Sequence, residues 1–126
     1  MRFLSLAFLL IFSLNVAAQS PAVSKLVTDG TRFANQEDFD QALQNYKTAL
    51  LAAENEYLGA RYLARLHYNI GVCHFRRGRY DLASDQFKSA ILLDKEDARA
   101  HSALGIAQMR KRNLKAAVGS LKNVLN

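Results

Sequence analysis

The chain repeats itself with a period of about 34 residues, the separation of Gly71 from Gly105, and this period limits its possible folds more than any other feature. When Gly71 is placed on Gly105, the neighbouring positions keep their size and polarity. The matched pairs are Ile70 with Leu104, Tyr80 with Leu114, Ala83 with Ala117, Phe87 with Leu121, and Ile91 with Leu125. An internal period of this length is typical of solenoids, in which each unit buries its apolar face against its neighbours.

A third copy of the unit lies upstream, with Gly30 in the place of Gly71. Its matches are Phe39 with Tyr80, Ala42 with Ala83, Tyr46 with Phe87, and Ala49 with Ala90. This copy is seven residues longer than the period, which amounts to about two helical turns, and we expect the extra residues within 54–63. They would form a longer second helix or a longer connection between two units.

Each unit is expected to contain two helices, because a helix-ending signal falls near its middle. Gly78 can adopt the left-handed conformation that ends a helix, and Asn113 can adopt it at lower preference. The breaks are expected at residues 35–40, 76–81 and 110–115, one in each copy. After each break, apolar residues recur at intervals of four and three, which places them on one helix face. These residues are Ala42, Tyr46 and Ala49; Ala83, Phe87 and Ala90; and Ala117, Leu121 and Val124.

Two stretches, "GVCHFRRGRYDLASDQFKSA" and "DFDQALQNYKTAL", resemble the tetratricopeptide repeat. Together with the period, the resemblance covers roughly residues 23–126. It implies an all-α fold, a right-handed superhelical solenoid of about three antiparallel helix pairs. The repeats would span about residues 23–56, 64–97 and 98–126, with a seven-residue extension at 57–63.

The resemblance also implies a binding site, because the first helices of tetratricopeptide arrays line a concave groove that holds extended peptides or partner helices. The expected groove residues of the last two repeats are Arg65, Tyr68, Val72, Phe75, Arg76, Arg99, Ser102, Ile106, Met109 and Arg110. The first repeat would add Ser24, Val27, Thr31, Ala34 and Asn35. Arginine binds carboxylates with paired N–H donors. We therefore expect a protein or peptide partner with an apolar segment and acidic groups or a C-terminal carboxylate.

One subclass of the family clamps the C-terminal carboxylate of chaperones with specific lysine, asparagine and arginine residues. Only Asn69 and Arg99 match that clamp here. Val27, Thr31 and Ala103 occupy its other positions. The chaperone clamp is therefore not expected in this chain.

No catalytic, metal or cofactor site is predicted. Cys73 is the only cysteine and matches Ala107 of the next repeat, so we expect a small buried thiol. His67 and His74 are seven residues apart, too far for two ligands of one ion without a third element. His67 and His101 occupy equivalent positions and are expected to pack inside their repeats. Because no paired carboxylates, H-E-x-x-H motif or nucleophile elbow is present, the sequence favours a non-enzyme.

Residues 1–18 are expected to form a signal peptide, with Arg2, an apolar run over residues 3–12 and small residues ending at Ala18. An uncleaved anchor is the alternative. Cleavage after Ala18 would leave a short segment at residues 19–22 and lower the net charge from +6 to +5. An exported basic chain is expected to meet acidic peptides, glycans or lipid headgroups rather than nucleic acid. We expect a periplasmic protein of a Gram-negative bacterium, or a secreted one.

The last repeat has no separate capping helix after it. A solenoid needs a polar outer face at its end, and Ala116, Val118, Leu121 and Leu125 are apolar. We therefore expect self-association, giving a homo-oligomer, or docking through residues 114–126. The leading hypothesis is an exported interaction adaptor that scaffolds an envelope complex through its groove. The alternative is a structural protein that assembles through the uncapped C-terminal helix.

Overall fold

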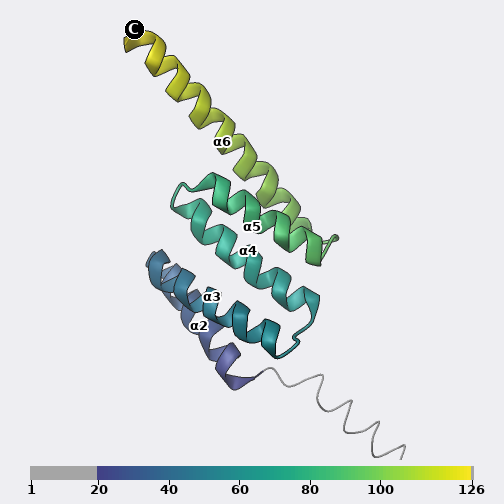
Figure 1. The fold of residues 1–126 in the computed structure, drawn as a ribbon. Helices are drawn as coiled ribbons and strands as arrows, with labels where there is room; N and C mark the ends of the chain where they lie inside the picture. The colour runs from purple at the N-terminus through teal and green to yellow at the C-terminus, as the bar shows by residue number, and fades with distance from the viewer. Residues whose placement is uncertain (1–19, 126) are drawn as a thin grey trace, which may run out of the picture.

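The computed structural model describes residues 20–125, and these residues form helices and no strands (Figure 1). The helices are α2 (Pro21–Asn35), α3 (Phe39–Asn55), α4 (Ala60–Arg76), α5 (Tyr80–Leu93) and α6 (Ala98–Leu125). Each helix packs against the next one along the chain, so the helices stack in sequence order. The predicted all-α solenoid is confirmed.

The predicted signal peptide, residues 1–18, lies outside the described residues. The short segment predicted at 19–22 overlaps the start of α2, where Pro21 begins the helix and the Ser20 hydroxyl accepts a hydrogen bond from the Ala22 N–H at 3.3 Å. Proline suits this position because its fixed φ matches a helix and its missing N–H has no partner there. Within residues 20–125, no helix is both long and apolar enough to cross a membrane.

Left-handed turns separate the helices within each of the first two pairs. Gly78 has a φ of +73° between α4 and α5, as its sequence position predicts. Glu37 takes the same role between α2 and α3 with a φ of 61°. Tyr57 has a φ of 55° in the connection between α3 and α4. Non-glycine residues adopt this conformation at a cost, so the fold contains two strained turn positions that the sequence does not reveal.

A glycine on the first helix of each complete pair receives an aromatic ring from the second helix. A Cβ atom on Gly30 would lie 2.8 Å from Tyr46 Cε1, and one on Gly71 would lie 2.6 Å from Phe87 Cε1. Both aromatic residues are buried, with exposed fractions of 3% for Tyr46 and 1% for Phe87. The two helices of each pair can approach this closely only because glycine has no side chain.

The third repeat differs from its prediction, because α6 is one continuous helix of 28 residues (Figure 1). The break expected at residues 110–115 does not occur. Arginine, lysine and leucine in this stretch all favour helix, and it contains no glycine to stop one. Lys111 also forms an ion pair with Asp81, which holds the middle of α6 beside α5. A Cβ on Gly105 would meet nothing within 4 Å, so no other helix of residues 20–125 covers this side of α6.

The seven extra residues of the first repeat lengthen two helices and leave the connection unchanged. α3 has 17 residues where α5 has 14. Four-residue connections follow both helices, at 56–59 and 94–97. The remaining extra turn lies at the start of α4, which begins at Ala60. The predicted extension at 57–63 is therefore part connection and part helix.

Candidate peptide-binding groove

Tyr68 on α4 lies at the centre of the candidate groove, because three neighbouring hollows share its side chain. The central hollow has a volume of about 160 Å³ and a lining of apolar and aromatic residues only. These residues are Tyr68, Val72 and Phe75 of α4, Phe87 of α5, and Ala103 and Ile106 of α6. A dry apolar cavity of similar size can hold a benzene-sized group, so this hollow can take one apolar side chain.

The two flanking hollows are more polar and extend the groove to both sides of Tyr68. One lies between α2, α3 and α4 and includes Thr31, Asn35 and Asn69. The other opens at the start of α6 beside Arg99 and Ser102. A side chain that enters the central hollow therefore has hydrogen-bonding groups on both sides, which suits an extended peptide backbone.

Three of the predicted groove arginines lie over aromatic rings. The guanidinium carbon of Arg76 is 5.6 Å from the centroid of Phe39, that of Arg99 is 5.2 Å from Tyr68, and that of Arg110 is 5.8 Å from Phe75. A cation over a ring face is held by the ring quadrupole. Tyr68 and Phe75 line the central hollow, so Arg99 and Arg110 place positive charge beside it, whereas Arg76 and Phe39 line the flanking hollow.

Two of these arginines already have acidic partners within the chain. Arg76 donates a hydrogen bond to Glu37 at 2.9 Å, and Arg99 contacts Asp97 at 3.3 Å. Burial by itself would raise the pKa of Asp97, but hydrogen bonds from the Arg99 side chain and backbone outweigh it and hold that pKa below its usual value. The Arg76–Glu37 pair is exposed, and exposed pairs contribute about 0–1 kcal/mol, so a carboxylate of a bound peptide can replace Glu37. The Asp97 side chain is only 8% exposed, whereas that of Arg99 is 61% exposed and can meet a further carboxylate. Among the described residues, Arg110 has no acidic partner.

The structure brings most of the predicted groove residues of the last two repeats together and leaves three outside the hollows, of which Arg110 lies over the Phe75 ring. Val72, Phe75 and Ile106 line the central hollow with Tyr68. Arg65 is exposed and lines none of the three hollows, and Met109 is 64% exposed beyond their edge. Of the residues expected from the first repeat, Thr31, Ala34 and Asn35 line the hollow beside Arg76. Ser24 and Val27 do not line it.

Sequence reasoning missed the aromatic residues that the second helices contribute. Phe87 fills the Gly71 position inside its helix pair and also forms part of the hollow. Phe39 lies under Arg76 at the start of α3. The resemblance assigns groove residues to first helices only. The match of Phe39 with Tyr80 was the available signal, because Tyr80 also packs edge-on against Phe75, with ring centroids 5.3 Å apart.

Cys73 is buried, as the sequence predicts, and burial raises the pKa of its thiol to about 11. His67 Nδ1 lies 2.8 Å from Gln86 Oε1 in a partly buried contact between α4 and α5. The expectation that His101 packs inside its repeat is wrong: the residue is exposed, and its Nε2 donates to the Lys95 carbonyl oxygen at 2.8 Å. It is exposed because, within residues 20–125, no further helix follows α6 to pair with it and cover His101. Residues 20–125 contain no group of three or more histidine, cysteine or acidic side chains that could hold a metal ion.

Comparison with known proteins agrees with this architecture. The description "Tetratricopeptide repeat" matches residues 32–96 and, in a second variant, residues 74–123. The human protein "Zinc finger CCCH domain-containing protein 7B" is 31% identical over 83 residues, which cover 62% of this chain and 8% of that protein.

Two solved structures have the same fold. The first tetratricopeptide domain of Spaghetti (RPAP3), bound to the HSP90 peptide SRMEEVD, aligns with a TM-score of 0.65 at 21% identity and covers 86% of this chain and 82% of that one. The second domain, bound to the same peptide, aligns with a TM-score of 0.64 at 22% identity and covers 83% and 91%. The family match spans more than half of the sequence, and the chain therefore belongs to the tetratricopeptide repeat family.

Proposed function

We propose that the chain is a protein-interaction module that binds an extended peptide across Tyr68. The observation that carries this proposal is the 160 Å³ apolar hollow, with Arg99 and Arg110 over two of its own rings and Arg76 over Phe39 in the neighbouring hollow. Apolar and aromatic pockets beside arginine are common anchor points of protein interfaces. Such an arrangement provides binding energy and direction but no group that would carry out a reaction, so a non-enzymatic role suits it best.

The chemistry of the groove favours a peptide with one apolar side chain and acidic neighbours. The apolar side chain would fill the hollow beside Ile106. Carboxylates on either side would meet Arg99 and Arg110 and would replace Glu37 as the partner of Arg76. The two Spaghetti domains bind an acidic peptide on the same fold, which supports a peptide of this class. Because only Asn69 and Arg99 match the chaperone clamp, affinity here would come from the stacked arginines.

The proposal extends to the place of action, which we infer to be outside the cytoplasm, in a protein that scaffolds a complex of the cell envelope. Its support is the sequence pattern of residues 1–18 and the basic charge of the chain. The test is mass spectrometry of the N-terminus of the chain recovered from cells. A chain that starts at Gln19 supports export, and one that starts at Met1 in the cytosolic fraction contradicts it.

The groove proposal is tested by fluorescence anisotropy with labelled SRMEEVD and with a copy in which both glutamates are glutamine. The chain is expected to bind the acidic peptide more tightly than its neutral copy. The double variant Arg99→Ala/Arg110→Ala should lose about tenfold or more in affinity for the acidic peptide. Arg61→Ala is the matched control, because Arg61 is exposed on α4 and lines none of the three hollows. Equal binding of the two peptides, or equal loss in both variants, would contradict the proposal.

A further inference from the structure

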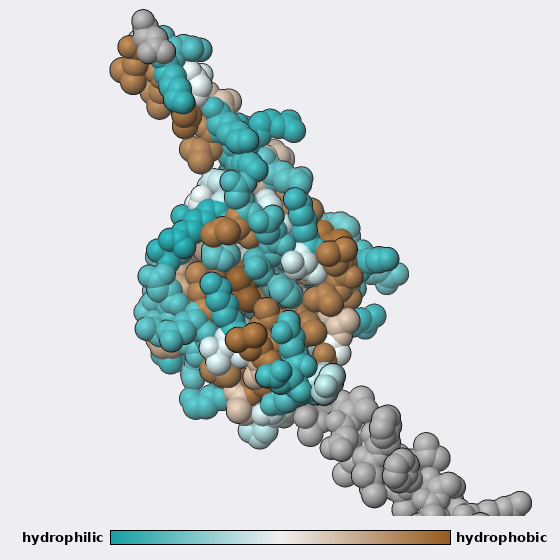
Figure 2. Space-filling model, in the orientation of Figure 1, coloured by the Kyte–Doolittle hydropathy of each residue, from teal (hydrophilic) through white to brown (hydrophobic). Residues whose placement is uncertain are grey.

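The second half of α6 carries an apolar stripe that no other described helix covers. Its members are Leu114, Val118, Leu121 and Leu125, with exposed fractions of 54, 45, 63 and 83%. Their spacings of four, three and four residues place them on one helix face. Figure 2 shows brown, hydrophobic atoms along one side of the projecting part of α6 and teal, hydrophilic atoms along the other.

This stripe continues an interface that already exists inside the molecule. Ala100, Leu104 and Ala107 lie on the same face of α6 and pack against α4 and α5. The same spacing then leads through Lys111 to Leu114, which lies beside Tyr80 at the start of α5. Past that point α6 projects beyond the N-terminal end of α5 (Figure 1). The stripe is therefore the unpaired continuation of the α5–α6 contact.

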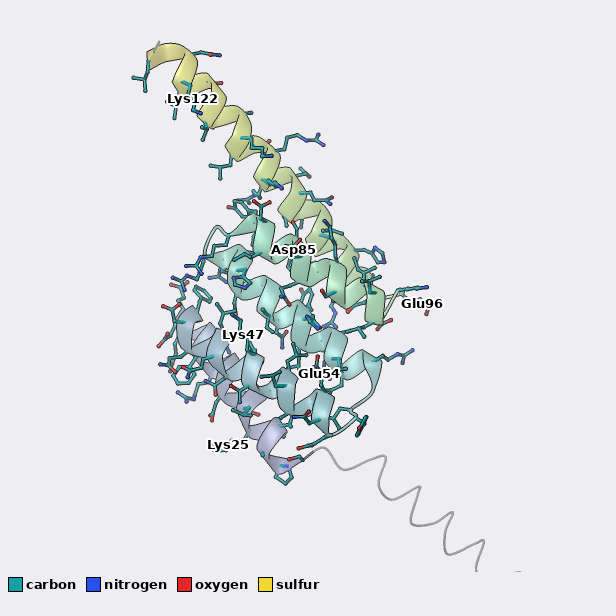
Figure 3. The ribbon with its side chains drawn as sticks, in the orientation of Figure 1. Lys25, Lys47, Glu54, Asp85, Glu96 and Lys122 are labelled. Carbon is teal, nitrogen blue, oxygen red and sulfur yellow. The ribbon has the colours of Figure 1, made fainter. Side chains whose placement is uncertain are left out.

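Positive charge follows the same flank of the helix. The Lys111 ammonium forms an ion pair with Asp81 of α5, and its hydrogen bond to that carboxylate holds the pKa of Asp81 below its usual value. Lys115 and Lys122 continue the flank on the projecting part, and Figure 3 shows Lys122 near the free end of α6. The whole of α6 contains six arginine and lysine residues and no acidic residue.

We propose that the stripe binds an acidic amphipathic helix of another protein, which lies beside α6 as an extension of the line of α5. Apolar residues of that helix, spaced as in a coiled coil, would cover Leu114, Val118 and Leu121. Its aspartate or glutamate residues would meet Lys115 and Lys122 as Asp81 meets Lys111. About three helical turns are enough to cover residues 114–125. This surface is separate from the groove at Tyr68.

The stripe could also be covered by a second copy of the chain or by a fold-back of its own C-terminal segment, and charge disfavours both of these occupants. A second copy would bring another basic α6 with no acidic residue, so cations would face cations. A fold-back of residues 114–125 onto Gly105 would lay a segment with a net charge of +2 against the first half of α6, which is also basic and has no acidic residue. Like charges disfavour both arrangements, and an acidic helix fits both the stripe and its flank.

The experiment uses the full chain and a designed 21-residue helix with leucine at the coiled-coil core positions and glutamate beside them. One control peptide has lysine for every glutamate, and another keeps the glutamate sequence except for one central proline that prevents a helix. Isothermal titration calorimetry is expected to show binding of the glutamate helix and at least tenfold weaker binding of both controls. Leu121→Ser should weaken the glutamate helix about tenfold or more. Asn123→Ser is the matched control, because it changes an exposed residue on the opposite side of the same segment.

Charge reversal gives a second, independent result. Lys115→Glu/Lys122→Glu should exchange the preference, so that the lysine helix binds more tightly than the glutamate helix. The groove variant Arg99→Ala/Arg110→Ala should bind the glutamate helix as the unchanged chain does, which separates this surface from the groove. Equal binding of the glutamate and lysine helices would overturn the proposal. So would sedimentation equilibrium showing a dimer that Leu121→Ser dissociates, because a second copy would then occupy the stripe.

Discussion

Substitution of Gly71 by alanine tests how closely the helices of a repeat approach one another. The new Cβ would lie 2.6 Å from Phe87 Cε1 and 2.8 Å from its Cδ1. Real Cβ atoms do not come this close, so the buried ring, which is 1% exposed, or the helix that carries it must shift. Overpacking of a core costs about 1–3 kcal/mol, and the better helix propensity of alanine returns about 1 kcal/mol. We expect Gly71→Ala to lower the free energy of unfolding by up to about 2 kcal/mol.

Gly105→Ala is the matched control in the next repeat. Its Cβ would meet nothing within 4 Å on the uncovered side of α6. Alanine should therefore raise the free energy of unfolding by up to about 1 kcal/mol through helix propensity alone. Urea unfolding followed by far-UV circular dichroism gives both values from the shift in midpoint. If Gly105→Ala destabilises the chain as much as Gly71→Ala does, residues 114–125 fold back against Gly105 and the description of α6 is wrong.

Three further predictions concern the single residues His74, Cys73 and Tyr57. Burial lowers the pKa of His74, and the charges of Lys47, Arg79 and Arg77 lower it further, so its contribution to stability is present above pH 6.5 and is lost as the pH falls below that value. His74→Phe should weaken this pH dependence in urea unfolding between pH 7 and about 5, and an unchanged slope would contradict the assignment. Cys73 should react slowly with a thiol reagent at pH 8 in the folded chain and at least about a hundredfold faster in urea, because its thiol is buried with a pKa of about 11; fast reaction of the folded chain would show that α4 opens easily. Tyr57→Gly should raise the free energy of unfolding by up to about 1 kcal/mol, because Tyr57 is 93% exposed with a φ of 55°. A melting temperature below that of the unchanged chain would show that the ring has a packing role.

The helix pairs could be predicted from the sequence because their packing depends on residue size at fixed spacing. Gly30 and Tyr46 have the same separation in the sequence as Gly71 and Phe87, and the structure joins both pairs. Gly78 also ends α4 as expected, since glycine adopts a positive φ without strain.

The same size rule gave the wrong result for the third repeat. Gly105 and Leu121 have the same spacing, but no helix ends between them. The break depended on Asn113, which adopts a left-handed conformation less readily than glycine and sits among strong helix formers. The Lys111–Asp81 ion pair, which supports the continuous helix, joins two helices that are distant in the sequence and leaves no local pattern.

The candidate groove could be predicted in outline from the family resemblance. Tyr68, Val72 and Ile106 line one hollow because first helices lie side by side in the stack, and their role in binding a peptide stays a prediction. The acidic partners of the arginines could not be predicted, since Glu37 reaches Arg76 only through the packing of one helix pair on the next. Phe39, the ring beneath Arg76, was missed for the same reason.

The central claim is that the peptide site lies at Tyr68, and a two-dimensional amide NMR titration tests it most directly. The chain is labelled with nitrogen-15 and titrated with SRMEEVD. We expect the largest shifts around Tyr68, Val72, Phe75 and Ile106, with smaller ones at Arg99 and Arg110. Shifts confined to the opposite face of the stack, at residues such as Asp85 and Lys88 of α5, or no shifts at millimolar peptide, would contradict it.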